Sequence, residues 1–239
     1  MIADIAAKNM AELQANPYPG RGIVIGENHL GQFIQIYWVM GRSENSRNRV
    51  LVGEDDLIRT APYDPSKVKD PSLIIYNAMK TVGNQHIVSN GAQTDTVAEY
   101  LVRGTGTFED ALATWSHEPD PPNNTPRISG LLDSTSGAFV LSKIVADPVD
   151  PSASIWTTYR YVSTRPGYGL CFHTYVGDGN PLPSFDRDPY LVRLTGTPAE
   201  IASTYWRLLD EQNRVALVVK AIQRATSQVE YRIINRLGG

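Results

Sequence analysis

The chain has 239 residues, of which 41% are hydrophobic and 20% charged, so it has the length and composition of a globular protein with a sizeable core. The net charge of −3 excludes a strongly basic surface for nucleic acid. No apolar run approaches the ~20 residues that a membrane span needs, and the N-terminus lacks the basic segment of a signal peptide. We therefore expect a cytoplasmic protein that binds neither nucleic acid nor membranes.

Cysteine and histidine are sparse. The single cysteine, Cys171, cannot form an internal disulfide, and its apolar neighbours favour a core position over a nucleophile. The histidines are scattered and lack metal-binding spacing: His29, His86, His117 and His173. We expect neither a metal nor a cofactor.

The beginning of the chain predicts a helix and then a hairpin. Residues 1–15 carry apolar side chains close to helical spacing, and prolines follow them. Residues 22–26 and 32–40 have the pattern of two strands. The polar residues 28–31 between them are typical of a hairpin connection.

The next part of the chain is less regular. Residues 41–49 predict a polar loop with three arginines, and residues 50–52 predict a short strand. Three prolines in residues 60–72 predict a second loop. Residues 72–80 are apolar and fit a strand or a helix, with Asp70-Pro71 slightly favouring a helix start.

A strand, a polar turn and a helix follow one another in residues 84–97, which read N-Q-H-I-V-S-N-G-A-Q-T-D-T-V. The strand is expected at residues 86–88 and the helix at residues 97–103. This arrangement leaves N–H groups pointing outward at a helix N-terminus, which suits a phosphate. The alternative is a purely structural turn in which Thr94 or Asp95 caps the helix.

The rest of the chain is rich in strands. Thr107 begins a second predicted helix, and the proline-rich residues 118–124 end it before residues 125–128 enter a strand. Thr197-Pro198 has the signal of a helix N-terminus. Further strands are expected at residues 138–145, 155–162, 169–176, 190–195, 215–222 and 229–234. Groups of strands around helices predict an α+β protein in which two stacked sheets lie between helical layers.

Blocks of the sequence, in the same order, resemble the archaeal-type IMP cyclohydrolase family. They are residues 18–22 with Arg42, Ser43 and Arg47 beyond them, and residues 76–83, 88–96 and 124–128. The resemblance covers residues 17–130 well and the C-terminal half loosely.

The resemblance implies a four-layer αββα sandwich resembling the N-terminal-nucleophile hydrolase fold, without the N-terminal nucleophile. It also implies that residues 1–16 are a helical extension before a single cyclohydrolase-like domain over residues 17–239. We further expect a homo-oligomer.

The resemblance implies an enzyme that closes 5-formamidoimidazole-4-carboxamide ribonucleotide to inosine monophosphate with loss of water, in de novo purine biosynthesis. A carboxamide nitrogen must attack a formyl carbon of the same molecule, so a near-attack geometry matters most. Charge grows on the formyl oxygen and needs a donor, a base must take the amide proton, and an acid must help water leave. This chemistry does not require a metal, a cofactor or a covalent nucleophile.

Positions that match the family's motifs supply these groups. Tyr76 and Asn77 are candidate donors to the developing oxyanion, and Arg47 is the candidate that stabilises its charge. Glu118 is the candidate general base, with Asp120 as a rival because the proline-rich loop shifts the spacing by one residue.

The candidate ligands of the ribonucleotide come from the same blocks and from the polar turn. They are Arg21, Ser89, Asn90, Gly91, Thr94, Asp95, Asn124 and Arg127. Two alternatives stay open, a non-catalytic purine-nucleotide-binding paralogue and an amidohydrolase with an N-terminal nucleophile. The second needs a Cys, Ser or Thr at the strand entrance, where residues 18–20 are Tyr-Pro-Gly.

Overall fold

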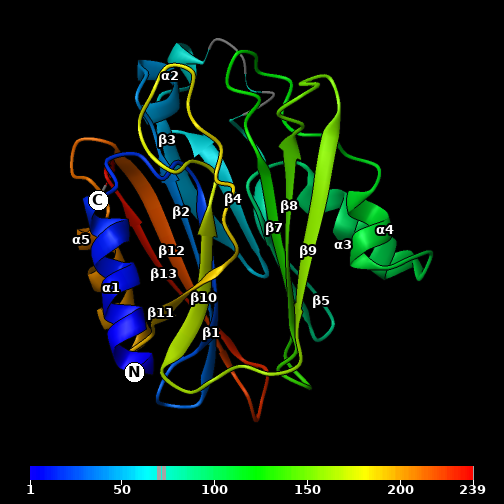
Figure 1. Ribbon diagram of the computed structural model, residues 1–239. Helices are drawn as coiled ribbons and strands as arrows, with labels where there is room; N and C mark the ends of the chain where they lie inside the picture. The colour runs from blue at the N-terminus through cyan, green and yellow to red at the C-terminus, as the bar shows by residue number, and fades with distance from the viewer. Residues whose placement is uncertain (69–70, 72–73, 239) are drawn as a thin grey trace.

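Two antiparallel sheets make up the middle of the protein (Figure 1). The computed structural model describes residues 1–68, 71 and 74–238. The six-stranded sheet has the order β11 (Tyr190–Arg193), β10 (Tyr168–His173), β1 (Gly22–Glu27), β2 (Gln32–Met40), β12 (Arg214–Gln223), β13 (Val229–Asn235). The seven-stranded sheet has the order β3 (Arg49–Glu54), β4 (Leu57–Pro62), β5 (Asn77–Val82), β6 (Gln85–Ser89), β7 (Arg127–Asp133), β8 (Phe139–Ala146), β9 (Ser154–Tyr161).

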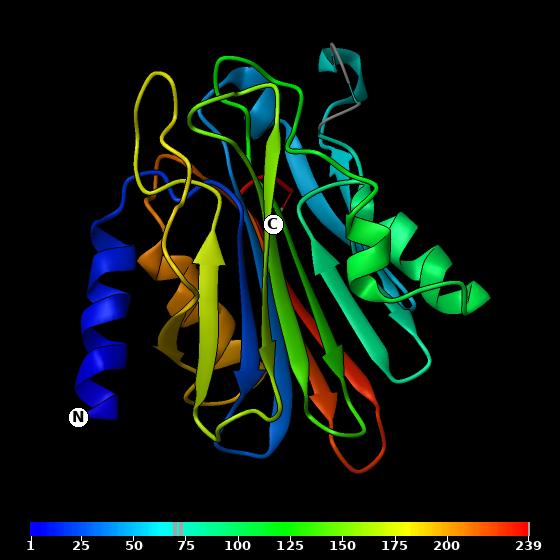
Figure 2. The same cartoon turned by 45° about the vertical axis from the view of Figure 1, so that its right-hand side comes forward.

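Helices cover the outer faces of both sheets, so the layers follow the order helix, sheet, sheet, helix (Figures 1 and 2). The helices on the six-stranded sheet are α1 (Ile2–Ala15) and α5 (Pro198–Leu208). Those on the seven-stranded sheet are α3 (Gln93–Arg103) and α4 (Phe108–Leu112). Loops carry the short helix α2 (Glu44–Arg47) and the 3-10 turn η1 (Pro65–Lys67). Within the described residues, no helix is both long and apolar enough to cross a bilayer.

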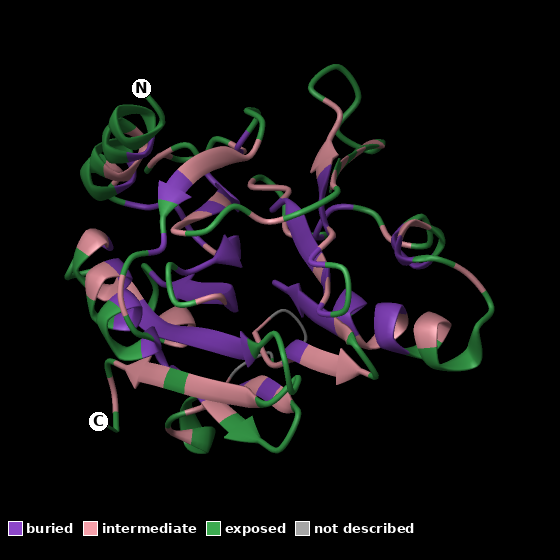
Figure 3. Ribbon diagram, turned by 90° about the horizontal axis from the view of Figure 1, so that it is seen from below, coloured by how far each residue is buried: buried purple, intermediate pink, exposed green. Residues whose placement is uncertain are grey.

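Three apolar clusters hold the layers together, and one of them lies between the two sheets, in the buried interior of Figure 3. Strand β2 is buried along its whole length because both of its faces are covered. Phe33 and Tyr37 point into the inter-sheet cluster, whereas Ile36 and Trp38 pack beneath the outer helices. Burying each such side chain stabilises the fold by roughly 1.5–3 kcal/mol. The same alternation turns the Tyr37 hydroxyl toward the other sheet.

Most elements expected from the sequence are confirmed. They include the N-terminal helix, the hairpin over residues 22–40 and the helices that begin after Thr107 and Thr197. Both threonines accept the N–H of the third helical residue, as capping residues do. The strands expected in the second half are also present, as β8 to β13. The protein is therefore an α+β protein with two antiparallel sheets.

Two predictions for the first half are wrong. The loop expected over residues 60–72 begins later, because β4 continues to Pro62, and a proline is tolerated at the end of a strand. The helix alternative for residues 72–80 is wrong because residues 77–82 form β5, whose pairing with β4 and β6 decides the conformation of a short apolar run. The helix start expected at Asp70 lies outside the described residues.

Two boundaries also differ from expectation. The loop over residues 41–49 contains the single turn of α2, whose N-cap is Ser43. The helix expected at residues 97–103 begins at Gln93, with Ala92 as its N-cap, so neither Thr94 nor Asp95 caps it. The Thr94 hydroxyl instead donates to a carbonyl in the preceding turn.

Candidate active site

A buried polar cluster lies between the sheets at one end of the molecule, where β1 and β7 begin and β6 and β10 end (upper end in Figure 1). The side chains of this cluster come from segments that are far apart in the sequence. Only the stacking of the two sheets brings them together.

An ion pair between Arg21 and Glu118 forms the centre of the cluster. Nη2 of Arg21 donates to both carboxylate oxygens of Glu118, at 3.1 and 2.9 Å, and the two side chains are only 11% and 3% exposed. Burial raises the pKa of Glu118, while the positive charges of Arg21 and Arg127 act in the opposite direction. Nε of Arg21 is buried and has no hydrogen-bond partner among the described residues.

Gly20 lets the chain enter β1 close to β10. Its φ is +73°, and a Cβ atom on it would lie 2.1 Å from Oγ1 of Thr174. The Thr174 hydroxyl instead accepts the N–H of Arg21 at 3.1 Å, and the Arg21 carbonyl accepts the N–H of Thr174 at 2.9 Å. The backbone on both sides therefore fixes the starting point of the Arg21 side chain.

Asn90 joins the turn after β6 to the ion pair and to the start of β7. Its amide donates to Oε1 of Glu118 at 3.2 Å and to the carbonyl of Pro126 at 2.9 Å. Its Oδ1 accepts the N–H of Ile128 at 2.8 Å and Nε2 of Gln93 at 3.0 Å. Because both ends of the side chain are occupied, Asn90 holds the Glu118 carboxylate in one orientation.

Two tyrosines meet across the inter-sheet space. The hydroxyls of Tyr37 and Tyr76 are 2.6 Å apart, and Tyr76 is 6% exposed. Burial raises the pKa of Tyr37 well above its ordinary value, and the neighbouring Tyr76 raises it further. Tyr37 therefore keeps its proton. The positive charges of Arg21 and Arg49 act on the pKa of Tyr37 in the opposite direction.

Arg127 lies against the polar turn after β6. Its Nε donates to the Ser116 carbonyl at 3.0 Å, and its Nη1 donates to Oε1 of Gln93 at 3.1 Å. Its guanidinium stacks over the ring of Trp115 at 4.6 Å. A Cβ atom on Gly91 would lie 2.7 Å from Nη1 of Arg127, so only glycine lets the arginine come this close to the turn.

The two rival carboxylates have different surroundings. Asp120 accepts the N–H of Thr125 at 2.7 Å and its hydroxyl at 2.5 Å, and so closes the proline-rich loop. Glu118, by contrast, contacts Arg21 and Asn90 in the cluster. The structure therefore brings Glu118 to the cluster and leaves Asp120 in the loop.

Asn77 and Asp95 lie on the opposite face of the seven-stranded sheet, beside α3. Asn77 directly follows Tyr76, and successive side chains in a strand point to opposite faces. The Asn77 amide donates to the two oxygens of Asp95 at 2.9 and 3.0 Å, and Nζ of Lys80 donates to Asp95 at 2.6 Å. The structure does not bring these two predicted residues to the polar cluster.

Within the described residues, Arg47 forms its hydrogen bonds with groups other than the two tyrosines. Its Nε donates to the Gly41 carbonyl at 2.9 Å, and its Nη2 donates to Oδ1 of Asn213 at 3.1 Å. Arg49, which the sequence did not single out, is 3% exposed and acts electrostatically on Tyr37. The position of Arg49 at the start of an apolar strand is the sequence signal for a functional role, because a buried arginine needs specific partners.

The remaining predicted residues shape the backbone. Ser89 and Thr94 are buried, their hydroxyls contact each other, and both donate to the Gly91 carbonyl, at 3.3 and 3.1 Å. Asn124 has a φ of +45°, which asparagine tolerates better than most residues. The Ser89 and Thr94 side chains therefore support the turn after β6, and the Asn124 backbone supports the proline-rich loop.

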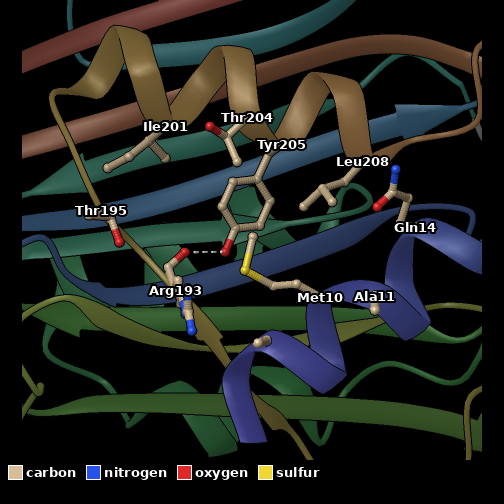
Figure 4. Close-up of a pocket in the computed structure, with 10 residues that line it drawn as sticks. Met10, Ala11, Gln14, Arg193, Thr195, Ile201, Thr204, Tyr205 and Leu208 are labelled. Atoms are coloured by element: carbon tan, nitrogen blue, oxygen red, sulfur yellow. Dashed lines mark hydrogen bonds between the residues drawn. The ribbon is translucent and has the colours of Figure 1, made fainter. Parts of the chain in front are cut away.

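A groove of about 360 Å³ lies elsewhere, between α1 and α5 on the outer side of the six-stranded sheet (Figure 4). Met10, Tyr205 and Leu208 form much of its apolar wall, and the Tyr205 hydroxyl donates to the Arg193 carbonyl at 2.8 Å. The groove shares no lining residue with the polar cluster.

Comparison with known proteins identifies the family. A family model described as "IMP cyclohydrolase-like protein" matches residues 18–226. The chain is 31% identical over 122 residues to the IMP cyclohydrolase of Haloquadratum walsbyi, a match that covers 50% of this chain and 58% of that protein. It is 30% identical over 183 residues to the IMP cyclohydrolase of Methanopyrus kandleri, a match that covers 71% of this chain and 89% of that protein. The chain therefore belongs to the IMP cyclohydrolase-like protein family.

Proposed function

We propose that the protein is an IMP cyclohydrolase, which closes 5-formamidoimidazole-4-carboxamide ribonucleotide to inosine monophosphate with loss of water. The family and the archaeal IMP cyclohydrolases to which the chain is similar support this activity. The observation that carries the proposal is the convergence of the Tyr37–Tyr76 hydroxyl pair with the buried Arg21–Glu118 pair at one end of the inter-sheet space.

In this proposal Tyr76 donates to the oxygen on which charge develops. The Tyr37 hydroxyl keeps its proton and can donate it to the Tyr76 oxygen, at 2.6 Å. The proton of Tyr76 is then free for the formyl oxygen of the substrate, and Arg49 stabilises the developing charge. A donor positioned in a buried site costs no reorganisation during the reaction, which is why such donors are effective.

Glu118 takes the proton of the carboxamide nitrogen as that nitrogen attacks the formyl carbon. Burial raises the pKa of Glu118, which makes it a better base than an exposed carboxylate. The oxygen of the tetrahedral adduct then leaves as water, with one proton returned by the same carboxylic acid and the other lost from the formamide nitrogen as its C=N bond forms. Arg21 and Asn90 hold the carboxylate in place through both of these steps.

Arg127 and the turn after β6 bind the phosphate in this proposal. Gly91 brings the Arg127 guanidinium against the start of α3, where helix N–H groups favour an anion. Ser89 and Thr94 shape the turn.

We assign supporting roles to the predicted residues that lie outside the cluster. Asn77 and Asp95 tie β5 to α3, which positions Tyr76 and the turn. Arg47 ties α2 to Asn213 and so supports the loop that leads to Arg49.

We also propose that residues 17–239 form one αββα domain resembling the N-terminal-nucleophile hydrolase fold, without the nucleophile. The layer order supports this, and so do residues 18–21, which read Tyr-Pro-Gly-Arg at the entrance to β1. Residues 1–16 are then an addition before the family's core, in agreement with the family match, which begins at residue 18.

The test is to mix the purified protein with the formylated ribonucleotide and to follow the purine absorbance. We expect inosine monophosphate to form, and we expect Arg49→Lys to lower the turnover by at least about tenfold because lysine lacks the planar fork. The matched variant Arg47→Lys should have a smaller effect. Equal effects would contradict the role of Arg49, and tight nucleotide binding without product would support a non-catalytic paralogue.

A further inference from the structure

Tyr175 lies two residues after β10, beside the start of β1, and is only 2% exposed. Its N–H donates to the Pro19 carbonyl at 3.3 Å, and its carbonyl accepts the Nδ1 hydrogen of His173 at 2.8 Å. A Cβ atom on Gly20 would lie 2.5 Å from Cδ2 of Tyr175, so the ring packs against the residue that precedes Arg21. Both the backbone and the ring of Tyr175 are therefore fixed beside the start of β1.

The hydroxyl of Tyr175 contacts the end of the proline-rich loop, which leads into β7 of the other sheet. It lies 2.5 Å from Oγ1 of Thr125. The Thr125 hydroxyl has one hydrogen, which it donates to Oδ2 of Asp120 at 2.5 Å. Tyr175 must therefore be the donor in its contact with Thr125. Burial raises the pKa of Tyr175 to about 12, so the phenol keeps this proton near neutral pH.

Thr125 connects this contact to Glu118. The Thr125 carbonyl accepts the N–H of Glu118 at 2.9 Å, and this hydrogen bond joins the two ends of the proline-rich loop. Asp120 accepts the N–H and the hydroxyl of Thr125, so it shapes the loop from within. The Tyr175 hydroxyl, by contrast, ties the loop to the six-stranded sheet.

The same short segment also holds the other partner of the ion pair. Thr174 exchanges hydrogen bonds with the backbone of Arg21, and the next residue, Tyr175, reaches the loop of Glu118 through Thr125. Arg21 precedes β1 of one sheet, whereas Glu118 lies in the loop before β7 of the other. Residues 174 and 175 therefore set the position of the two partners relative to each other.

We propose that Tyr175 is a positioning residue for the ring closure, because its hydroxyl, acting through Thr125, places Glu118 where it takes the proton of the carboxamide nitrogen. This inference rests on the proposed cyclohydrolase activity. Asn90 orients the carboxylate, whereas Tyr175 fixes the backbone from which the Glu118 side chain starts. Loss of the Tyr175 hydroxyl therefore affects the transition state more than the binding of the ribonucleotide.

The first test is steady-state kinetics of Tyr175→Phe, which keeps the ring stacked on Tyr18 and removes only the hydroxyl. A displaced general base loses part of its effect, so kcat should fall by roughly 10–100-fold while KM stays within about threefold. Thr125→Val should lower kcat by the same factor, and Thr125→Ser, which keeps the hydroxyl, should retain it. The double variant with Phe at 175 and Val at 125 should lose no more than either single variant, because both changes break the same contact.

Tyr205→Phe is the matched control. It also removes a buried hydroxyl, which donates to the Arg193 carbonyl at 2.8 Å on the outer side of the six-stranded sheet. It should lower the melting temperature about as much as Tyr175→Phe does and leave kcat and KM unchanged. An unaltered kcat in Tyr175→Phe, an equal loss in Tyr205→Phe or multiplied losses in the double variant would overturn the proposal. A KM that rises as much as kcat falls would also overturn it.

Hydrogen exchange tests the contact without using activity. The N–H of Glu118 should exchange at least about tenfold faster in Tyr175→Phe than in the unmodified protein, whereas Tyr205→Phe should leave its exchange unchanged. A protein that makes no inosine monophosphate would refute the proposed activity and, with it, the effect on kcat. Unchanged exchange in Tyr175→Phe would instead refute the hold of Tyr175 on Glu118.

Discussion

Lys220 offers a stringent test of how the inter-sheet core is built. It lies on β12, is 0% exposed, and its Nζ donates to the neutral hydroxyl of Thr81 at 2.7 Å. Its neighbours across the adjacent strands are Gln35 and Tyr231, and Asp56 acts on it only as a more distant charge. A charged amine is therefore buried without a carboxylate in contact.

The expected energy follows from the pKa. Burial lowers the pKa of Lys220 from 10.5 to about 7. Because the unfolded chain binds the proton more tightly, protonation favours unfolding, and the destabilisation is complete below pH 7 and absent above pH 10.5. This pKa difference destabilises the folded protein by roughly 5 kcal/mol when the lysine is protonated in both states, and by roughly 4 kcal/mol at neutral pH. Lys220→Met also loses one hydrogen bond of about 1 kcal/mol, so we expect the variant to be more stable by about 3 kcal/mol at pH 7.

The assay is urea unfolding of both proteins at a series of pH values from about 7 to about 9.5. The advantage of Lys220→Met should shrink to near zero at the upper end, while other titrating groups cancel in the difference. Lys8→Met, which changes an exposed lysine of α1, is the control and should leave the stability unchanged. A variant that is less stable at every pH, or an advantage that does not vary with pH, would refute the reasoning.

The remaining predictions concern turnover. Tyr76→Phe should lower kcat by ~10²–10³ because it removes one oxyanion donor, and it should lower the melting temperature slightly because the buried Tyr37 hydroxyl loses its partner; unaltered kcat would make Tyr76 a core aromatic. Arg127→Ala should raise KM for the ribonucleotide by roughly 10–100-fold and kcat should change less, the effect of losing a charged phosphate contact. Equal weakening of the dephosphorylated nucleoside would argue against phosphate binding. Glu118→Gln should lower kcat by ~10²–10⁴, whereas Asp120→Asn should lower mainly the melting temperature, and the reverse pattern would exchange their roles.

The sequence alone predicted the elements that depend on local interactions. The helices after Thr107 and Thr197 were predictable because a capping side chain and its N–H partner lie three residues apart. The apolar runs of the second half were predictable as strands because their composition and turn residues are local signals. Strand β5 was not, because a short apolar run becomes a strand only when its neighbours pair with it.

The sequence also singled out Arg21, Tyr76, Glu118 and Arg127 through short motifs, but it carried no information on which of these side chains meet. Arg21 and Glu118 are 97 residues apart and form a bidentate contact only because the two sheets stack. The strand alternation that turns Tyr76 inward turns Asn77 outward, so adjacent residues of one motif reach different faces. The family and the elements could therefore be read from the sequence, whereas the membership of the polar cluster was decided by non-local packing.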